Sequence, residues 1–389
     1  MNDHRGVLEE ALMAESIVFH VGIDLHKESV SLAVFKGPEQ EPEREVTLPN
    51  DWTRLRRIFE RLSENGAVKA CYEAGGCGFG LCRKLREMGV DCVVIAPSHI
   101  PVRPGDRRKT DQSDARKLAR NLRNGELVAV HVPGPAEERV RDLVRSRMVL
   151  VREVQRSRQY VLKMLLRLGL VFEGGKKHWT KVHRQWLLTL RLEGEQQKVL
   201  ERYLSLLQSK ELMLEEIETD VKRIAEQEPY VRPVGRLRCL RGLDTVAAMV
   251  LVTEVVDVLR FATARDFMGW VGLSVSESSS GGPGKQRMGG ITKTGNARCR
   301  FVLGQAAWSY ARPPRLSAAL LKRQEGQPQE VVDYARRAQR RLYRRFEALR
   351  MRKHSTIAAT AVARELAGFV WALLRDEKDK LLSRRRLSA

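Results

Sequence analysis

The chain changes character at Pro133-Gly134-Pro135, and this change limits the folds that are open to it. Before this point, short apolar runs alternate with amphipathic stretches, a pattern that predicts strands and helices in turn. After it, residues 136–168 contain no glycine or proline and repeat apolar side chains at spacings of three, four or seven, as one long helix does. We therefore expect a domain boundary at residue 133.

The part before the boundary predicts an α/β domain over residues 17–133. A turn at Lys27 and Glu28 separates the first two apolar runs, so these runs are expected to pair as antiparallel strands. Later strands alternate with helices, as in βαβ units. The expected strands are 17–24, 29–35, 43–48, 68–73, 92–97 and 128–132, and the expected helices are 52–62, 79–88 and 111–124.

Four acids of this domain lie where a site would gather. Asp24 and Glu73 each end a buried strand, and open α/β sheets bind their ligands at strand ends. Asp111 and Asp114 are three residues apart at an expected helix start, so both carboxylates lie on one face. Acids in a first helical turn also cap the helix and complement its dipole, so a purely structural role stays open for this pair.

Taken together, the four acids predict a metal site. Carboxylates that converge on one point repel each other unless cations lie between them. Oxygen-rich sites of this kind suit Mg²⁺ or Mn²⁺, and two such ions about 4 Å apart can hold the attacking and leaving oxygens of a phosphodiester. We predict a ribonuclease-H-like site with Asp24, Glu73, Asp111 and Asp114 as metal ligands and catalytic residues.

A sugar kinase of the actin and hexokinase type is the alternative for this domain, because it opens with a similar strand-Asp-turn-strand. Such kinases need further glycine-rich phosphate and adenosine loops, which the sequence does not clearly offer. The glycines of residues 75–80 lack the GxGxxG spacing of a dinucleotide site. They more simply free the backbone beside Glu73.

The charge of the chain points to a polyanionic partner. Lysine and arginine exceed the acids by 22, and the sequence pI is near 10.1. An excess of this size favours nucleic acid over mere solubility. The six cysteines form no CxxC pair, which argues against zinc, and they are expected to be reduced thiols of a cytoplasmic protein. No uninterrupted apolar run approaches the roughly 20 residues of a membrane span, so no membrane partner is expected.

Residues 134–228 predict two long helices, 136–168 and 194–227, each with an apolar stripe. They are expected to form an antiparallel coiled coil that dimerises the protein, although a helical bundle within one monomer would satisfy the same stripes. Arginines coat the first helix, and we expect Arg147 and Arg152 to contact phosphates, with some arginines used in salt bridges instead. Between the helices, Trp179, His183 and Trp186 are more often local core than a surface that stacks on bases.

Residues 229–375 predict a mostly helical domain interrupted by a polar, glycine-rich stretch at 274–296. A plain flexible linker would not need Lys285, Arg287 and Lys293 among its glycines. Serines beside glycine and cations could present a nucleophile to a bound phosphate, although the bare residues still favour a linker. Residues 376–389 form a basic tail. The expected nucleic-acid contacts are Lys109, Arg147, Arg152, Lys285, Arg287 and Lys293.

Several short motifs occur in an order that resembles the IS110 family of insertion-sequence transposases. The resemblance spans residues 18–374, and the ordered set is specific although each motif alone is not. The motifs are Val21-Gly22-Ile23-Asp24-Leu25-His26-Lys27, Tyr72-Glu73-Ala74, Lys109-Thr110-Asp111-Gln112-Ser113-Asp114-Ala115, Gly272-Leu273 with Ser279-Ser280-Gly281, Gly290-Ile291-Thr292-Lys293-Thr294-Gly295-Asn296, and a C-terminal helix at 361–371.

This resemblance implies a RuvC-like N-terminal domain whose DEDD metal site is the four acids above, a coiled-coil dimerisation segment, and a C-terminal transposase domain. It implies a recombinase that joins a DNA 5′-phosphate to a serine, acts as a tetramer (a dimer of dimers), and is guided by a bridge RNA. The family's Ser-Gly step assigns the nucleophile to Ser280, with Ser279 as the alternative because Ser278 and Ser279 precede it. Val275 stands where the family usually has proline, which can alter the loop.

Two other functions remain open from the sequence. A metal-dependent junction endonuclease would use the same acids with water as the nucleophile and would form no adduct. A non-catalytic nucleic-acid-binding protein would use the acids only structurally. Cleavage with and without Mg²⁺ separates these readings.

Overall fold

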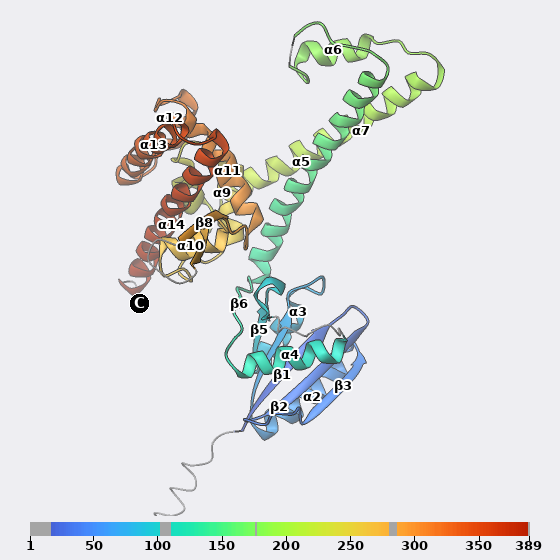
Figure 1. Ribbon diagram of the computed structural model, residues 1–389, viewed down its shortest axis with the longest axis vertical. Helices are drawn as coiled ribbons and strands as arrows, with labels where there is room; N and C mark the ends of the chain where they lie inside the picture. The colour runs from blue at the N-terminus through green and yellow to red at the C-terminus, as the bar shows by residue number, and fades with distance from the viewer. Residues whose placement is uncertain (1–16, 102–109, 176, 280–285, 388–389) are drawn as a thin grey trace, which may run out of the picture. The chain divides into compact units, whose positions relative to one another are not determined.

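The structure of the protein is a computed structural model that describes residues 17–101, 110–175, 177–279 and 286–387 (Figure 1). The chain forms two compact units, Met1–Pro133 and Gly134–Ala389. The first unit is built around a sheet, and the second is mostly helical, which confirms the expected fold class at this level. The α/β pattern and the glycine-free helical stripes were therefore sufficient to predict the fold class.

The first unit contains a six-stranded mixed sheet with the order β3-β2-β1-β4-β5-β6. β1, β2 and β3 are antiparallel neighbours, β1, β4 and β5 are parallel, and β6 pairs antiparallel with β5. The strands are β1 (Val18–Leu25), β2 (Ser29–Lys36), β3 (Arg44–Pro49), β4 (Ala67–Glu73), β5 (Asp91–Ile95) and β6 (Ala129–Val130). Central β1 thus lies between antiparallel β2 and parallel β4.

Helices cover both faces of this sheet. One face packs against α2 (Trp52–Asn65) and α3 (Gly80–Glu87), through side chains such as Ile23 and Tyr72. The other face packs against α4 (Asp111–Arg123), where Ala115 and Ala119 meet Ala33 and Phe35 of β2 and Leu118 meets Cys71 of β4. A short 3-10 helix, η1 (Pro97–His99), follows β5.

Gly22 lets α4 approach β1 directly. A Cβ atom at Gly22 would lie 2.0 Å from the carbonyl oxygen of Ala115 and 2.4 Å from the amide nitrogen of Ala119. At the same helix, Arg116 makes a bidentate ion pair with Glu45 of β3, with N–O distances of 2.6 and 2.7 Å. These two contacts fix where the N-terminus of α4 lies along β1.

In the second unit, α5 (Pro135–Arg167) and α7 (Gly194–Ala225) lie side by side and antiparallel, forming an arm (Figure 1). Ion pairs between the helices, Arg147–Glu218 and Arg158–Glu211, follow this opposite direction. The dimeric coiled coil stays a prediction. At the end of the arm, α6 (Lys181–Thr189) places His183 in a local aromatic and aliphatic cluster, fully shielded from solvent.

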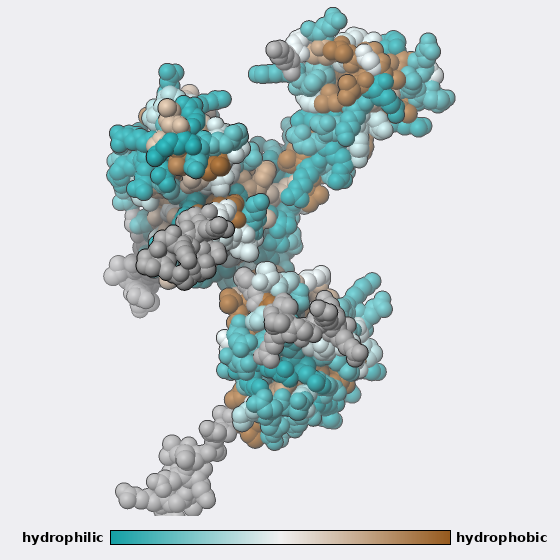
Figure 2. Space-filling view, viewed as in Figure 1, coloured by the Kyte–Doolittle hydropathy of each residue, from teal (hydrophilic) through white to brown (hydrophobic). Residues whose placement is uncertain are grey.

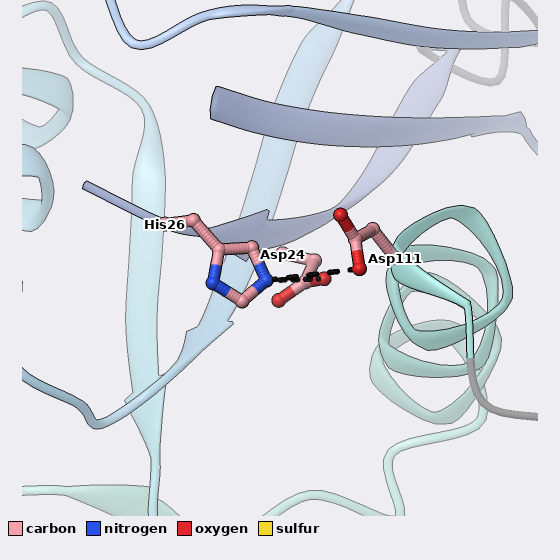
Figure 3. A group of neighbouring side chains, drawn as sticks. All are labelled: Asp24, His26 and Asp111. Carbon is pink, nitrogen blue, oxygen red and sulfur yellow. Dashed lines mark hydrogen bonds and ion pairs between the residues drawn. The ribbon is translucent and has the colours of Figure 1, made fainter. Parts of the chain in front are cut away.

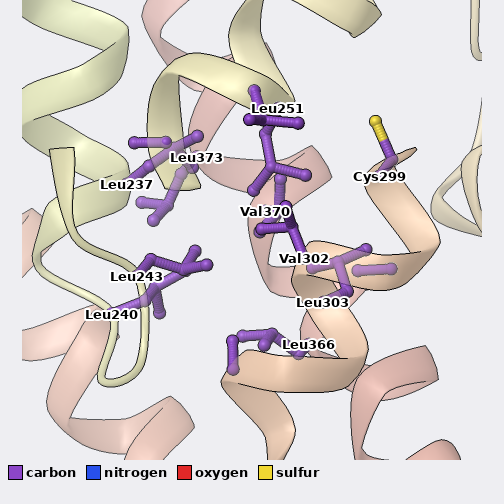
Figure 4. Close-up of a cluster of buried hydrophobic side chains, with 14 of the residues drawn as sticks. Leu237, Leu240, Leu243, Leu251, Cys299, Val302, Leu303, Leu366, Val370 and Leu373 are labelled. Atoms are coloured by element: carbon purple, nitrogen blue, oxygen red, sulfur yellow. The ribbon is translucent and has the colours of Figure 1, made fainter. Parts of the chain in front are cut away.

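The rest of the second unit is a helical bundle with one β hairpin. Figure 4 shows its core, where Leu366, Val370 and Leu373 of α14 meet side chains of neighbouring helices. Residues Ser355–Asp379 of α14 are long and apolar enough to cross a membrane by composition alone, but half of that window is buried against the bundle. The elements are α8 (Val231–Arg238), α9 (Thr245–Val255), α10 (Ala264–Val271), β7 (Val275–Ser279), β8 (Gln286–Ile291), α11 (Ala297–Ala307), η2 (Trp308–Ala311), α12 (Ala318–Gln324), α13 (Gln329–Arg350) and α14 (Ser355–Leu387).

Candidate functional site

Three side chains meet at the end of β1 (Figure 3). His26 Nε2 lies 3.2 Å from Asp24 Oδ2 and 3.8 Å from Asp111 Oδ1. One ligand atom from each residue lies within 4.8 Å of the other two, which is a spacing that one metal ion can bridge. Two elements distant in sequence, β1 and α4, therefore bring two of the four predicted acids together.

The start of α4 presents its acids for a local reason. Thr110 caps the helix, and its hydroxyl accepts a hydrogen bond from the Ser113 amide at 3.2 Å. Asp111 and Asp114 consequently both fall in the first turn, where the helix dipole favours negative charge. A purely structural role of these acids at the helix start is thus compatible with the structure. That role does not account for the approach of Asp111 to Asp24, which lies on another element.

The pKa of Asp24 reflects first its burial and then the charged groups around it. Burial raises the pKa of Asp24 above its ordinary value, and the nearby carboxylates of Asp111 and Asp114 raise it further. The charge and hydrogen bond of His26 act in the opposite direction without cancelling this rise. A divalent cation would remove the repulsion that an imidazole alone leaves. The oxygen donors present fit Mg²⁺ or Mn²⁺.

Glu73 lies beside this cluster, although its carboxylate is not among the three grouped side chains. Tyr72 of β4 is the register partner of Ile23 of β1, which makes Glu73 the neighbour of Asp24 on the adjacent strand. Side chains alternate along strands, and Cys71 packs on α4. Glu73 therefore shares the α4 face of the sheet with Asp24. The side chain is exposed, so rotation about its own bonds can bring it toward the cluster.

His26 is a residue to which the sequence analysis gave no role. It follows Asp24 by two positions, and in an extended chain residues two apart point to the same face. This period-2 relation to a candidate metal ligand is the signal that could have identified it.

The glycine-rich stretch after α10 contains a hairpin, in contrast to the linker that the bare residues favoured. β7 and β8 pair antiparallel, and Ser279 opposite Gln286 is the last described pair toward the tip. The base is held by the Ser276 hydroxyl, which donates to the Gly290 carbonyl at 2.9 Å. Ser280, Lys285 and Lys109 lie outside the described residues, as do the side chains of Ser279 and Arg287.

A buried acid supports the segment that follows this hairpin. Glu254 of α9 is 5% exposed and accepts hydrogen bonds from Arg145 Nε and Nη2 at 2.7 and 2.8 Å and from Asn296 Nδ2 at 2.8 Å. Burial alone would raise the pKa of Glu254, but Arg145, Asn296 and Arg298 outweigh it and hold the pKa below its ordinary value. The sequence signal that could have found this residue is a lone acid within the apolar run of α9.

The remaining predicted contacts lie apart from one another. Arg147 is engaged with Glu218 inside the arm, whereas Arg152 is exposed on α5. Lys293 is exposed just after β8, with a left-handed backbone (φ 57°) and its amide donating to the Gly272 carbonyl. The structure thus leaves Arg152 and Lys293 accessible to a nucleic acid, and it uses Arg147 to join two helices.

Comparison with known proteins adds a family to this geometry. A family model described as "Transposase" matches residues 21–169, and one described as "Transposase IS116/IS110/IS902 family" matches residues 235–320. "Putative transposase y4qE" of Sinorhizobium fredii is 39% identical over 362 residues, covering 92% of this chain and 89% of the relative. "Transposase for insertion sequence element IS1533" of Leptospira borgpetersenii is 33% identical over 340 residues, covering 86% and 97%.

Proposed function

The chain belongs to the IS110/IS116/IS902 family of insertion-sequence transposases, and from this premise we propose that it cuts and rejoins DNA through a serine–phosphate bond with help from divalent metal. Its DNA-processing activity follows from the family. The observation that carries the finer proposal is the approach of Asp24 and Asp111 across two elements, with Asp114 and Glu73 beside them.

The first unit is proposed to be an RNase H/RuvC-like domain. Support comes from its topology, in which three antiparallel strands are followed by two strands parallel to β1, in agreement with the antiparallel start and the βαβ units that the sequence predicts. In that arrangement the end of β1 faces α4 across the close contact at Gly22. A metal site at this edge of the sheet agrees with the place where α/β sheets bind ligands.

Asp24, Glu73, Asp111 and Asp114 would hold Mg²⁺, or Mn²⁺ in its place. When bound, the metal supplies Lewis-acid stabilisation of the negative charge that grows on the phosphoryl oxygens. Asp24 and Asp111 contribute oxygens from fixed elements, whereas exposed Glu73 can adjust its position. His26 orients the Asp24 carboxylate through their 3.2 Å contact.

Ser280 is the proposed nucleophile. Its hydroxyl oxygen attacks the scissile phosphorus and loses its proton as the new O–P bond forms. The bond from phosphorus to the 3′ oxygen breaks, and that oxygen leaves as a hydroxyl after gaining a proton. The 5′-phosphate stays on the serine as a diester, so a 3′ hydroxyl from another strand can reverse the step and rejoin the DNA. Ser279 is the alternative nucleophile.

Partners beyond DNA are also part of the proposal. The family resemblance suggests a tetramer and a guiding bridge RNA, and the formal charge of +22 supports nucleic-acid partners in general. Apolar side chains gather at the α6 end of the arm (Figure 2), where Leu166, Val171 and Leu188 are 70–77% exposed. An exposed apolar patch of this kind favours an interface between protein copies.

The test is a covalent adduct between the protein and labelled DNA that carries an element end, trapped in denaturing gels with Mg²⁺ present. We expect an adduct with the wild-type protein, none with Ser280→Ala, and a strongly reduced amount with Asp24→Ala. Ser279→Ala is the matched control and should keep the adduct. An adduct that persists in Ser280→Ala would move the nucleophile to Ser279 or Ser278. Cleavage without any adduct would instead favour a metal-only endonuclease.

A further inference from the structure

A groove lies beside the base of the β7–β8 hairpin in the second unit. Its volume is about 940 Å³. Residues from the hairpin strands line it together with residues of α10, α13 and α14. Val275 of β7 and Ile291 of β8 are part of this lining, so the groove borders the same two strands that lead to Ser279.

The groove is strongly basic. Among the described side chains that line it, five are cations and one, Glu365, is a carboxylate. The cations are Arg265, Lys293, Arg341, Arg345 and Arg364. Glu365 accepts contacts from both Arg341 and Arg345, at 3.1 and 3.2 Å, so it holds the two guanidinium groups next to each other. The side chains of Arg341 and Arg345 are 71% and 50% exposed. Glu365 balances part of this charge, but the five cations exceed it, so the groove favours an anionic ligand.

Apolar side chains lie among these cations. Met268 and Ile291 are half-buried, and Ile357 is 53% exposed. A lining that combines charged and apolar side chains suits a nucleic-acid strand, which presents both phosphates and sugars. A compact anion such as free phosphate would leave most of the groove unfilled.

The groove borders the strand that ends at Ser279. From Val275 to Ser279 the hairpin advances four residues, which is about 14 Å at the rise of an antiparallel strand. A DNA strand in a duplex advances about 3.4 Å per nucleotide, so this distance corresponds to about four nucleotides. A DNA strand that reaches the Ser279 end of β7 can therefore still have its neighbouring phosphates in the groove.

We infer that this groove binds the sugar–phosphate backbone of the DNA strand within about four nucleotides of the phosphate that the serine attacks. The inference rests on the proposed serine chemistry for the identity of that strand. Arg341 and Arg345 contact consecutive phosphates, and Glu365 sets their spacing when DNA is absent. The groove thus positions the substrate strand beside the β7–β8 hairpin.

Binding is tested in the Ser280→Ala background, where chemistry cannot contribute. The probes are fluorescein-labelled DNA and RNA oligonucleotides of one sequence, followed by anisotropy across a salt series. The Arg341→Gln/Arg345→Gln variant should bind DNA at least about tenfold more weakly and lower the slope of log K against log salt by about 1.4–1.8, as expected for two lost phosphate contacts. Arg341→Lys/Arg345→Lys keeps the charge and should restore most of the binding.

The matched control is Arg340→Gln/Arg344→Gln, which removes two exposed cations from the same helix outside the groove. This control should bind more tightly than the groove variant. Equal loss in both variants, or loss of RNA binding with DNA binding intact, overturns the inference.

The adduct assay separates the two proposals. Groove variants that lose DNA binding while the wild type forms no adduct would support the groove and reject the serine. If the wild type forms the adduct while the groove variants bind DNA as well as Ser280→Ala alone does, the result would support the serine and reject the groove.

Discussion

Each unit contains a carboxylate whose surroundings shift its pKa, and the two pKa values shift in opposite directions. In the second unit, Glu254 is buried and receives Arg145 and Asn296 at hydrogen-bond distance. In the first unit, the imidazole of His26 lies within 3.2 Å of Asp24 and 3.8 Å of Asp111 and is their positive contact among the described residues. The pKa of Glu254 is lowered, whereas the pKa of Asp24 is raised.

This difference separates a structural acid from a candidate metal ligand. Protein cations already neutralise Glu254, so its carboxylate joins α5, α9 and the start of α11. Among the described residues, His26 is the positive partner that contacts Asp24 and Asp111, and the proximity of the carboxylates costs free energy until a cation arrives. A functional acid is thus recognised by the charge that the protein leaves unbalanced, and not by burial alone.

The largest expected effect on stability comes from removing the balanced acid. Glu254→Ala leaves the Arg145 guanidinium without its partner and should lower the free energy of unfolding by about 2–4 kcal/mol, slightly less than for a fully buried pair because Arg145 keeps 32% of its side-chain exposure. Denaturant unfolding followed by tryptophan fluorescence measures this. Asp111→Asn is the control and should cost nothing, since it relieves repulsion. A large loss in Asp111→Asn would erase the distinction between the centres.

A smaller effect is expected from the contact that brings the unbalanced acids together. Gly22→Ala places a Cβ 2.0 Å from the Ala115 carbonyl oxygen, so α4 must shift, at a cost of about 1–3 kcal/mol. Asp111 moves with α4, so the variant should also bind metal more weakly. Gly76→Ala meets no atom within 4 Å and should change neither quantity. Thermal unfolding and metal titration of both variants check the pair, and equal behaviour would contradict the role of Gly22.

The smallest expected effect is a change in the pH dependence of stability. Because the folded-state pKa of Glu254 is lowered, its contribution is present above its ordinary pKa of 4.5 and is lost as pH falls through the folded value. Glu254→Gln removes that titration, so the stability difference between wild type and variant should be full at neutral pH and shrink in acid. Unfolding measured from pH 7 to about pH 3 tests the sign. A difference that grows in acid would contradict it.

The sequence predicted regular elements well because their periodicity is local. Alternating apolar residues located the strands on both sides of the turn at Lys27, and a cap with two acids located the start of α4. It also predicted that Asp24 and Glu73 each lie at the end of a strand. The register that makes Glu73 the neighbour of Asp24 follows from strand pairing, which a single strand does not contain.

Other features depended on contacts between distant residues. The β7–β8 hairpin is polar and glycine-rich, so it lacks the apolar alternation by which strands are recognised. Glu254 and Arg145 are 109 residues apart, and nothing local predicts their pairing. The apolar stripe on α5 predicts which face of that helix is buried, but it does not predict whether a helix of the same chain or of a second copy covers that face. Within one chain α7 covers part of it.

The most direct test of the account is Mn²⁺ binding by the full chain, measured by electron paramagnetic resonance. We predict that the wild-type protein and Glu254→Gln bind Mn²⁺ alike, and that Asp24→Asn/Asp111→Asn loses this binding while remaining folded. Mn²⁺ binding by the double variant equal to that of the wild type would contradict the claim that these carboxylates form a metal site.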